Sequence, residues 1–153
     1  MVDFVDLKEL LPSLSQTLDT NGKVAFTVAG NSMLPMLRHH TDSVTLIKPA
    51  LPLKRYAVVL FVREDGSPVL HRIVNIKNGE YVMRGDNCAY SEKTAPSQIV
   101  AELDSFTHKG KTYAASNRMY KLYAMLWCNG LCYFLRKRLL PKAKSAVKKI
   151  FKK

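Results

Sequence analysis

The spacing of hydrophobic positions changes twice along the chain. Near the N-terminus, apolar residues recur at alternating steps of three and four, which is the period of an amphipathic helix. Residues 1–22 are therefore predicted to be a helix with Asp3 as its N-cap and Asn21-Gly22 as its stop. Pro12 is expected to kink or split this helix. The apolar positions of the stripe are Phe4, Leu7, Leu11, Leu14 and Leu18.

Between residues 23 and 110 the pattern changes to short runs rich in β-branched and aromatic residues, separated by turn formers. Such runs are typical of an all-β domain, so we expect a mainly β fold, a compact barrel or coiled sheet. After Gly110 the composition shifts to Met, Leu, Tyr and Lys, which predicts a helical appendage over residues 111–153. The runs are KVAFTVAG, SVTLIK, YAVVLFV, PVLHRIVNI, EYVMR and SQIVAELDSF.

Length and charge point to one domain with an unusual tail. A chain of 153 residues, 47% of them hydrophobic, is long enough for a single domain with its own core. The formal net charge is +12, and residues 136–153 hold nine Lys or Arg and no Asp or Glu. The first 135 residues hold 15 basic and 12 acidic residues, which leaves +3 there. The basic character therefore belongs to the C-terminal tail.

Neither a secretory leader nor a metal or disulfide framework is predicted. The first residues, MVDFVDLKEL, are acidic where a signal peptide is basic, so we expect the protein to stay in the cytoplasm. Cys88, Cys128 and Cys132 are an odd number of cysteines, and no disulfide framework follows from them. His39 and His40 are expected to face solvent. Because no zinc-ligand spacing and no phosphate-binding loop is present, we expect no metal and no cofactor.

The segment GNSMLP, which begins at Gly30, places Ser32 between a glycine-led turn and a proline. Gly30 and Asn31 tolerate positive φ and Pro35 fixes its own, so an ordinary turn is the simpler interpretation. The alternative is that the turn holds Ser32 exposed as a nucleophile. The choice between them depends on whether a base lies nearby.

A candidate base comes from a predicted hairpin. Asn78-Gly79 is a strong hairpin signal, because both central residues of a type I′ turn need positive φ. With this turn and no bulge, His71 faces Asp86 across the two strands, with Cβ atoms about 4.5–5.5 Å apart. Such a pair supplies a base and an orienting carboxylate for a serine hydroxyl, and Asp86 would raise the pKa of His71. A cross-strand surface pair without a catalytic role is the alternative, and a single bulge would move His71 to the other face.

Together these motifs resemble the signal peptidase I superfamily, which also contains the self-cleaving LexA-type repressors. The resemblance covers residues 29–87 and lies in Ser-Met-x-Pro, His-Arg-Ile and Gly-Asp-Asn, in this order and spacing. It implies a signal-peptidase-like serine endopeptidase in which Ser32 is the nucleophile, His71 the base and Asp86 its partner. A histidine base is the pattern of the endoplasmic-reticulum and sporulation-type signal peptidases. Asp42 falls on a position that the family uses for its architecture.

The resemblance also assigns roles to the turn around the serine. Gly30 stands where members often carry a serine whose hydroxyl supports the oxyanion. Backbone N–H groups of the turn formed by Gly30, Asn31 and Ser32 must then hold the oxyanion. Met33 and Pro35, from the same motif, are expected to bind the substrate.

Two further departures from the family pattern shape the functional prediction. Residues 1–25 carry several charged side chains and cannot span a bilayer, unlike the anchor of members that export their substrates. No DNA-binding domain fits before the serine, which argues against a LexA-type repressor. We expect an endopeptidase that cleaves a peptide or protein, for instance a leader; the alternative is a catalytically degenerate, membrane-associated peptide-binding module. Self-cleavage is not expected, because the only Ala-Gly bond, Ala29-Gly30, adjoins Ser32 itself.

The C-terminal region raises the question of a membrane partner. Residues 122–135, LYAMLWCNGLCYFL, would form a helix about 21 Å long, too short for a hydrocarbon core of about 30 Å. This segment either packs on the β domain or lies at a membrane interface. Over residues 139–151 an apolar stripe opposes a lysine-rich face, which favours an anionic lipid surface. Nucleic acid is a less favoured partner, because Tyr and Trp precede the tail.

Overall fold

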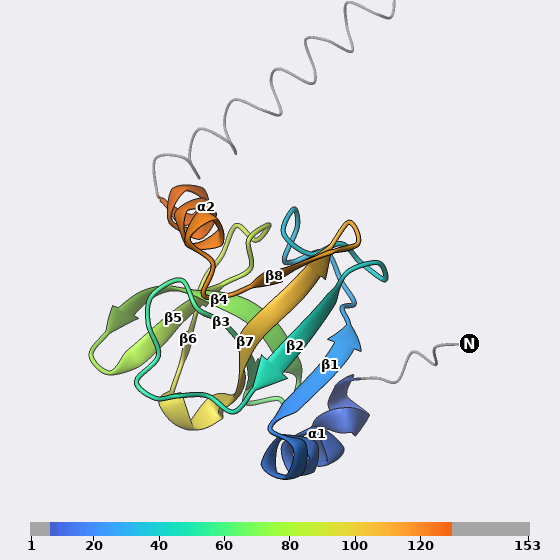
Figure 1. The fold of residues 1–153 in the computed structure, drawn as a ribbon. Helices are drawn as coiled ribbons and strands as arrows, with labels where there is room; N and C mark the ends of the chain where they lie inside the picture. Colours follow the sequence, from blue (N-terminus) through green and yellow to red (C-terminus); the bar gives the residue numbers. More distant parts are fainter. Residues whose placement is uncertain (1–6, 130–153) are drawn as a thin grey trace, which may run out of the picture.

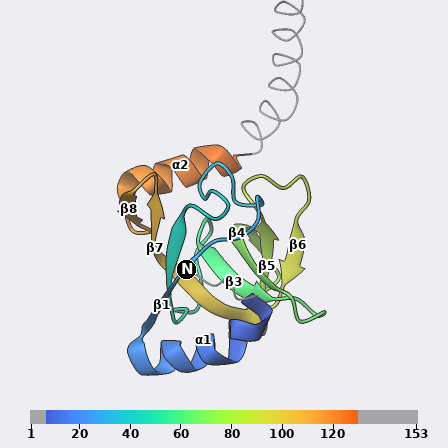
Figure 2. The ribbon, with the colours of Figure 1, turned by 90° about the vertical axis from the view of Figure 1, so that its right-hand side faces the viewer.

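The computed structural model describes residues 7–129, which form a curved antiparallel sheet with one helix at each end (Figure 1). Seven strands follow one another in the order β1-β2-β7-β3-β4-β5-β6, and β8 pairs with β7 beside them. Seen from the side, α1 and α2 lie at opposite ends of the sheet (Figure 2). The elements are α1 (Leu7–Asn21), β1 (Lys23–Thr27), β2 (Ser43–Ile47), β3 (Val58–Val62), β4 (Pro68–Lys77), β5 (Glu80–Arg84), β6 (Glu92–Thr94), a 3₁₀ turn (Pro96–Gln98), β7 (Ile99–His108), β8 (Lys111–Ala114) and α2 (Arg118–Cys128).

The predicted fold class is confirmed, and each of the six apolar runs contains a strand. Two short strands, β6 and β8, were not predicted. The sheet therefore continues past Gly110, where a helical region was expected to begin, and the helix starts only at Arg118. Lys109 and Gly110 both have positive φ, 51° and 75°, and close the β7–β8 hairpin. A lysine at the first of these positions is not a recognised hairpin signal, which is why the pattern concealed β8.

Helix α1 is a single element that runs through Pro12 and ends before Gly22, whose φ is 71°. Pro12 was expected to kink or split the helix; it does not split it, and the kink stays a prediction. Leu14 and Leu18, from the predicted stripe, are buried in the core, and this burial stabilises the turns that follow the proline. The proposed cap, Asp3, lies outside the described residues, as do Phe4 and residues 130–153.

Two hydrophobic clusters form the core. The larger cluster joins α1, β2, β3, β7 and α2, with partly buried residues of β1 packed against it, and it also takes in apolar side chains of the loop between β1 and β2. The smaller cluster lies among β3, β4 and β5. The large cluster therefore anchors the loop that carries Ser32 to the main body of the protein. Its buried members from that loop are Val28, Met33, Met36 and Leu37.

Helix α2 shows that the beginning of the 122–135 segment does pack on the β domain. Asn117 caps the helix, because its side-chain oxygen accepts hydrogen bonds from the backbone N–H groups of Met119 and Tyr120. One face of α2 is buried through Tyr120, Ala124 and Cys128. Within residues 7–129, no helix is long and apolar enough to cross a membrane.

Candidate active site

Ser32 lies in the loop of residues 28–42, the serine loop, which is closed at its base by backbone hydrogen bonds. The Val28 N–H donates to the Asp42 carbonyl at 3.0 Å, and the His40 N–H donates to the Val28 carbonyl at 2.9 Å. His39 is exposed, as predicted, but its Nδ1 accepts a hydrogen bond from the Gly30 N–H at 2.7 Å. His39 thus fixes the glycine turn before Ser32, a structural role that the sequence did not reveal.

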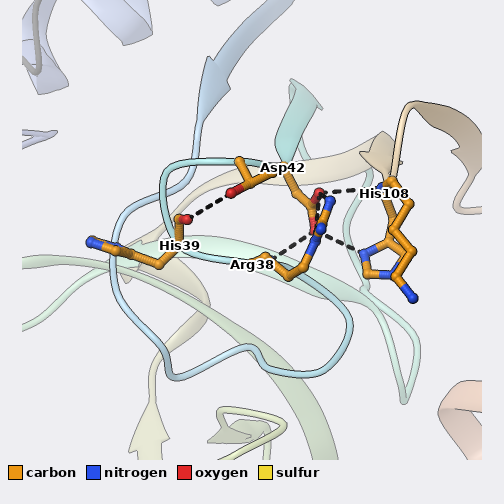
Figure 3. A network of polar contacts seen from close by, with 6 residues as sticks. Arg38, His39, Asp42 and His108 are labelled. Carbon is orange, nitrogen blue, oxygen red and sulfur yellow. Dashed lines mark hydrogen bonds and ion pairs between the residues drawn. The ribbon is translucent and has the colours of Figure 1, made fainter.

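The C-terminal end of this loop is held in place by the buried carboxylate of Asp42 (Figure 3). It accepts hydrogen bonds from the backbone N–H and the guanidinium of Arg38, and its Oδ2 lies 2.8 Å from His108 Nδ1. Desolvation alone would raise the pKa of Asp42, but the hydrogen bonds from Arg38 and His108 outweigh it and hold the pKa well below its usual range. Asp42 is therefore an ionised anchor of the serine loop, consistent with the architectural role expected from the resemblance.

The predicted β4–β5 hairpin is present, but its register changes partway along. Asn78 and Gly79 have φ values of 50° and 79°, and Lys77 pairs with Glu80 as expected for a two-residue turn. Between Ile73 and Asn75 a bulge inserts one extra residue on β4. Every residue before the bulge is therefore shifted by one position against β5.

The shift overturns the predicted pairing of His71 with Asp86. Asp86 instead binds Arg72 in a bidentate ion pair, with Nε–Oδ1 and Nη2–Oδ2 distances of 2.8 and 2.7 Å. Both side chains are completely buried. Arg72 also donates hydrogen bonds to the Tyr56 carbonyl and the Tyr120 hydroxyl. Asp86 is thus a counterion that neutralises a buried guanidinium, and its charge raises the pKa of His71 less than the charge of Glu92 does.

The carboxylate beside His71 belongs to Glu92, a residue that the sequence analysis missed. His71 Nδ1 lies 3.3 Å from Glu92 Oε1, an ion-pair distance at which the geometry does not make an aligned hydrogen bond. Arg63 binds both oxygens of Glu92, at 2.6 and 2.7 Å. Strand β6, which pairs Glu92 with Met83 of β5, brings the carboxylate to this place. A lone glutamate in a three-residue strand carries no sequence pattern that predicts it.

Gly85 is the point where the serine loop and the histidine meet. A Cβ atom placed on Gly85 would lie 2.6 Å from the Ser32 carbonyl oxygen, 2.7 Å from Cys88 Sγ and 3.0 Å from His71 Nε2. No side chain fits there, so glycine is required for the close approach. The Asn87 N–H donates to the Ser32 carbonyl at 2.8 Å, which fastens the two loops together. Its side chain also donates to the Asn31 carbonyl.

The three residues of the Gly-Asp-Asn motif therefore have distinct structural roles. Gly85 leaves room for the serine loop and the imidazole, Asp86 neutralises Arg72, and Asn87 binds the serine loop. The contact with His71 that was predicted for Asp86 is made by Glu92.

The protonation state of the pair fits a general base. Desolvation by burial lowers the pKa of His71 below its ordinary value and outweighs the opposing charge of Glu92. The expectation that Asp86 raises the pKa of His71 overall is therefore wrong. Hydrogen bonds from Arg63 lower the pKa of Glu92. At neutral pH a neutral imidazole thus stands beside an ionised carboxylate.

The turn residues differ in what they offer to an oxyanion. The Gly30 N–H is already bonded to His39, whereas the Ser32 N–H has no acceptor among residues 7–129. Met33 is buried in the large core cluster, so its predicted contact with a substrate is wrong. Pro35 is exposed, and its role in substrate binding stays a prediction.

Within the described part of the chain, no group of three His, Cys, Asp or Glu side chains is placed to hold a metal ion. Cys88 and Cys128 form no disulfide within the described residues, and Cys132 lies outside them. No protein-family model matches the chain, and no curated protein matches it.

Proposed function

We propose that this chain is a serine endopeptidase in which Ser32 is the nucleophile, His71 the general base and Glu92 the carboxylate that orients the base. The observation that carries the proposal is the convergence at Gly85. The Ser32 carbonyl oxygen and His71 Nε2 both border the space that a Gly85 side chain would occupy, while His71 Nδ1 faces Glu92. The proposal adds that the Ser32 hydroxyl turns toward His71 Nε2, because a base between a serine and a carboxylate is the arrangement that activates a hydroxyl.

The proposed reaction is acyl transfer through Ser32. His71 Nε2 accepts the hydroxyl proton as Ser32 Oγ bonds to the carbonyl carbon of the scissile peptide, and the Ser32 N–H donates to the oxyanion. The C–N bond then breaks, and the protonated His71 gives its proton to the leaving amine. A water molecule, deprotonated by the same imidazole, releases the acyl group and restores the Ser32 hydroxyl.

Glu92 would act by position and charge. Its carboxylate, held by Arg63, favours the imidazolium that forms when His71 takes the serine proton. A contact of 3.3 Å is longer than an aligned charged hydrogen bond, and such contacts often tighten only when substrate binds.

The resemblance to the signal peptidase I superfamily supports a peptide or protein as the substrate, and removal of a leader is the specific activity we favour. A second candidate is a catalytically degenerate peptide-binding module at a membrane. The burial of His71, only 2% exposed, and its imperfect contact with Glu92 favour that alternative. The two candidates differ in whether Ser32 can be acylated by a substrate or phosphonylated by a probe.

A fluorophosphonate probe tests the proposal. Attack by Ser32 Oγ forms an O–P bond and expels fluoride with the serine proton, so intact mass rises by the probe minus HF. The proposed enzyme gives one adduct that Ser32→Ala abolishes, while Ser116→Ala, a change at an exposed serine before α2, retains it. A folded protein that forms no adduct, or an adduct that persists in Ser32→Ala, would contradict the proposal and favour the binding module.

A further inference from the structure

The outward face of α2 is apolar although it faces solvent. Met119 is 73% exposed, Leu122 and Met125 are 44% exposed and Leu126 is 50% exposed. Because successive residues of a helix are rotated by about 100°, all four fall within one stripe on the side away from Tyr120, Ala124 and Cys128. Leu122 and Met125, at the edge of this stripe, also line a pocket between α2 and the sheet. Four of the seven exposed large hydrophobic residues in the described part of the chain thus belong to one 11-residue helix.

The charges around this face indicate what covers it. Helix α2 contains two basic residues, Arg118 and Lys121, both exposed, and no acidic residue. The chain that follows carries nine Lys or Arg and no Asp or Glu between residues 136 and 153. Two copies of a chain with this excess of positive charge would repel each other, whereas an anionic lipid surface attracts the charges and accepts the apolar side chains.

Helix α2 is also fixed to the candidate active site. The Trp127 indole N–H donates to the Asp86 carbonyl at 3.1 Å, and the Tyr120 hydroxyl accepts a hydrogen bond from Arg72. Both views show α2 beside the loops at that end of the sheet (Figures 1 and 2). A surface that holds the outward face of α2 therefore also holds the Gly-Asp-Asn loop close to it.

We propose that the outward face of α2, formed by Met119, Leu122, Met125 and Leu126, lies in the interface of an anionic bilayer and holds the Gly85 region at the membrane surface. The partner is then lipid, and any peptide that reaches Ser32 does so beside the headgroups. This docking does not depend on the chemistry of Ser32, so Ser32→Ala protein should bind vesicles as the wild type does.

The test compares full-length variants in sedimentation with vesicles of phosphatidylcholine, with or without phosphatidylglycerol. Leu122→Ser combined with Leu126→Ser removes two side chains from the face, and we expect partitioning to fall at least about tenfold. Leu51→Ser combined with Ile76→Ser is the matched control, because these residues are similarly exposed but lie outside α2. Circular dichroism confirms that both variants are folded, and Trp127, the only tryptophan, reports contact with brominated lipid.

Selective loss in the α2 variant, dependence on the anionic lipid and quenching of Trp127 together support the docking. Equal partitioning of the α2 variant and the control would overturn it and assign binding to the basic tail alone. Binding to neutral vesicles as strong as to anionic ones would also overturn it. So would a concentration-dependent dimer, without vesicles, that the α2 variant abolishes, because the face would then contact a second copy.

Discussion

At the residue scale, two carboxylates near the imidazole have separate tasks, and their variants should separate stability from chemistry. Asp86 neutralises the guanidinium of Arg72, and neither side chain is exposed to solvent. Asp86→Asn therefore leaves an uncompensated buried charge. We expect its free energy of unfolding in urea to fall by about 3–5 kcal/mol. Glu92 pairs with the partly exposed Arg63, so Glu92→Gln should cost only about 0–1 kcal/mol.

The rate of Ser32 modification should be affected in the opposite order. Glu92→Gln removes the charge that favours the imidazolium, and we expect fluorophosphonate modification of Ser32 to slow by about 10²- to 10⁴-fold. Lys93→Gln is the control: Lys93 neighbours Glu92 on β6, and its exposed ion pair with Glu80 of β5 is lost, so this variant should react at the wild-type rate. If Glu92→Gln reacts normally while Asp86→Asn folds normally but fails to react, Asp86 is the orienting acid and our assignment is wrong.

The pH dependence of modification follows from His71. Neutral imidazole is the reactive form, and desolvation lowers the pKa of His71 below the reference value of about 6.5. The rate should therefore be level through neutral pH and fall only as the medium becomes more acidic than about pH 6.5. Because the charge of Glu92 raises the pKa of His71, Glu92→Gln should move this acid limb to still lower pH. A wild-type acid limb above pH 7 would show that the pKa is raised.

At the element scale, sequence patterns predicted what depends on local regularity. The alternating runs located six strands, and Asn78-Gly79 located a hairpin, because positive φ at both positions is a local requirement. The bulge at Val74 was not predictable, since nothing in the segment RIVNI, residues 72–76, specifies which residue has no partner on β5. That single residue decides which carboxylate meets His71. Glu92 reaches the site through pairing across β5, a contact between segments that share no pattern.

The close contact between the serine loop and the loop after β5 gives an element-scale prediction. Gly85→Ala puts a methyl group within 3.0 Å of the Ser32 carbonyl, Cys88 Sγ and His71 Nε2, so the loops must separate. We expect modification of Ser32 to slow by about 10²-fold, as for a displacement of about 1 Å. The control is Gly110→Ala, where φ is 75° but the surrounding space is open. It should lower stability by about 1–2 kcal/mol through strain without slowing modification, and equal rates in both variants would count against the meeting point at Gly85.

At the scale of the whole molecule, charge and apolar surface are concentrated at the C-terminal side. Residues 1–135 are nearly balanced in charge, whereas the remaining 18 residues carry nine positive charges. Helix α2, which carries four exposed apolar side chains, lies at the end of the sheet opposite α1 (Figure 2). The sequence alone presented core packing and membrane contact as alternatives for this region. Helix α2 is amphipathic in a way that allows both: Tyr120, Ala124 and Cys128 pack on the β domain, while the apolar side chains of the opposite face are exposed.

This arrangement predicts a two-part response of vesicle binding to salt. The electrostatic attraction between basic residues and anionic lipid is screened as the Debye length falls from about 10 Å at 0.1 M to about 3 Å at 1 M salt. Burial of the α2 side chains is not screened, so full-length protein should retain a fraction on anionic vesicles at 1 M salt. The variant with Leu122→Ser and Leu126→Ser should lose that fraction while still binding at low salt through its charges. Complete release of the wild type by salt, together with displacement from vesicles by DNA or RNA at low salt, would instead identify nucleic acid as the partner of the basic tail.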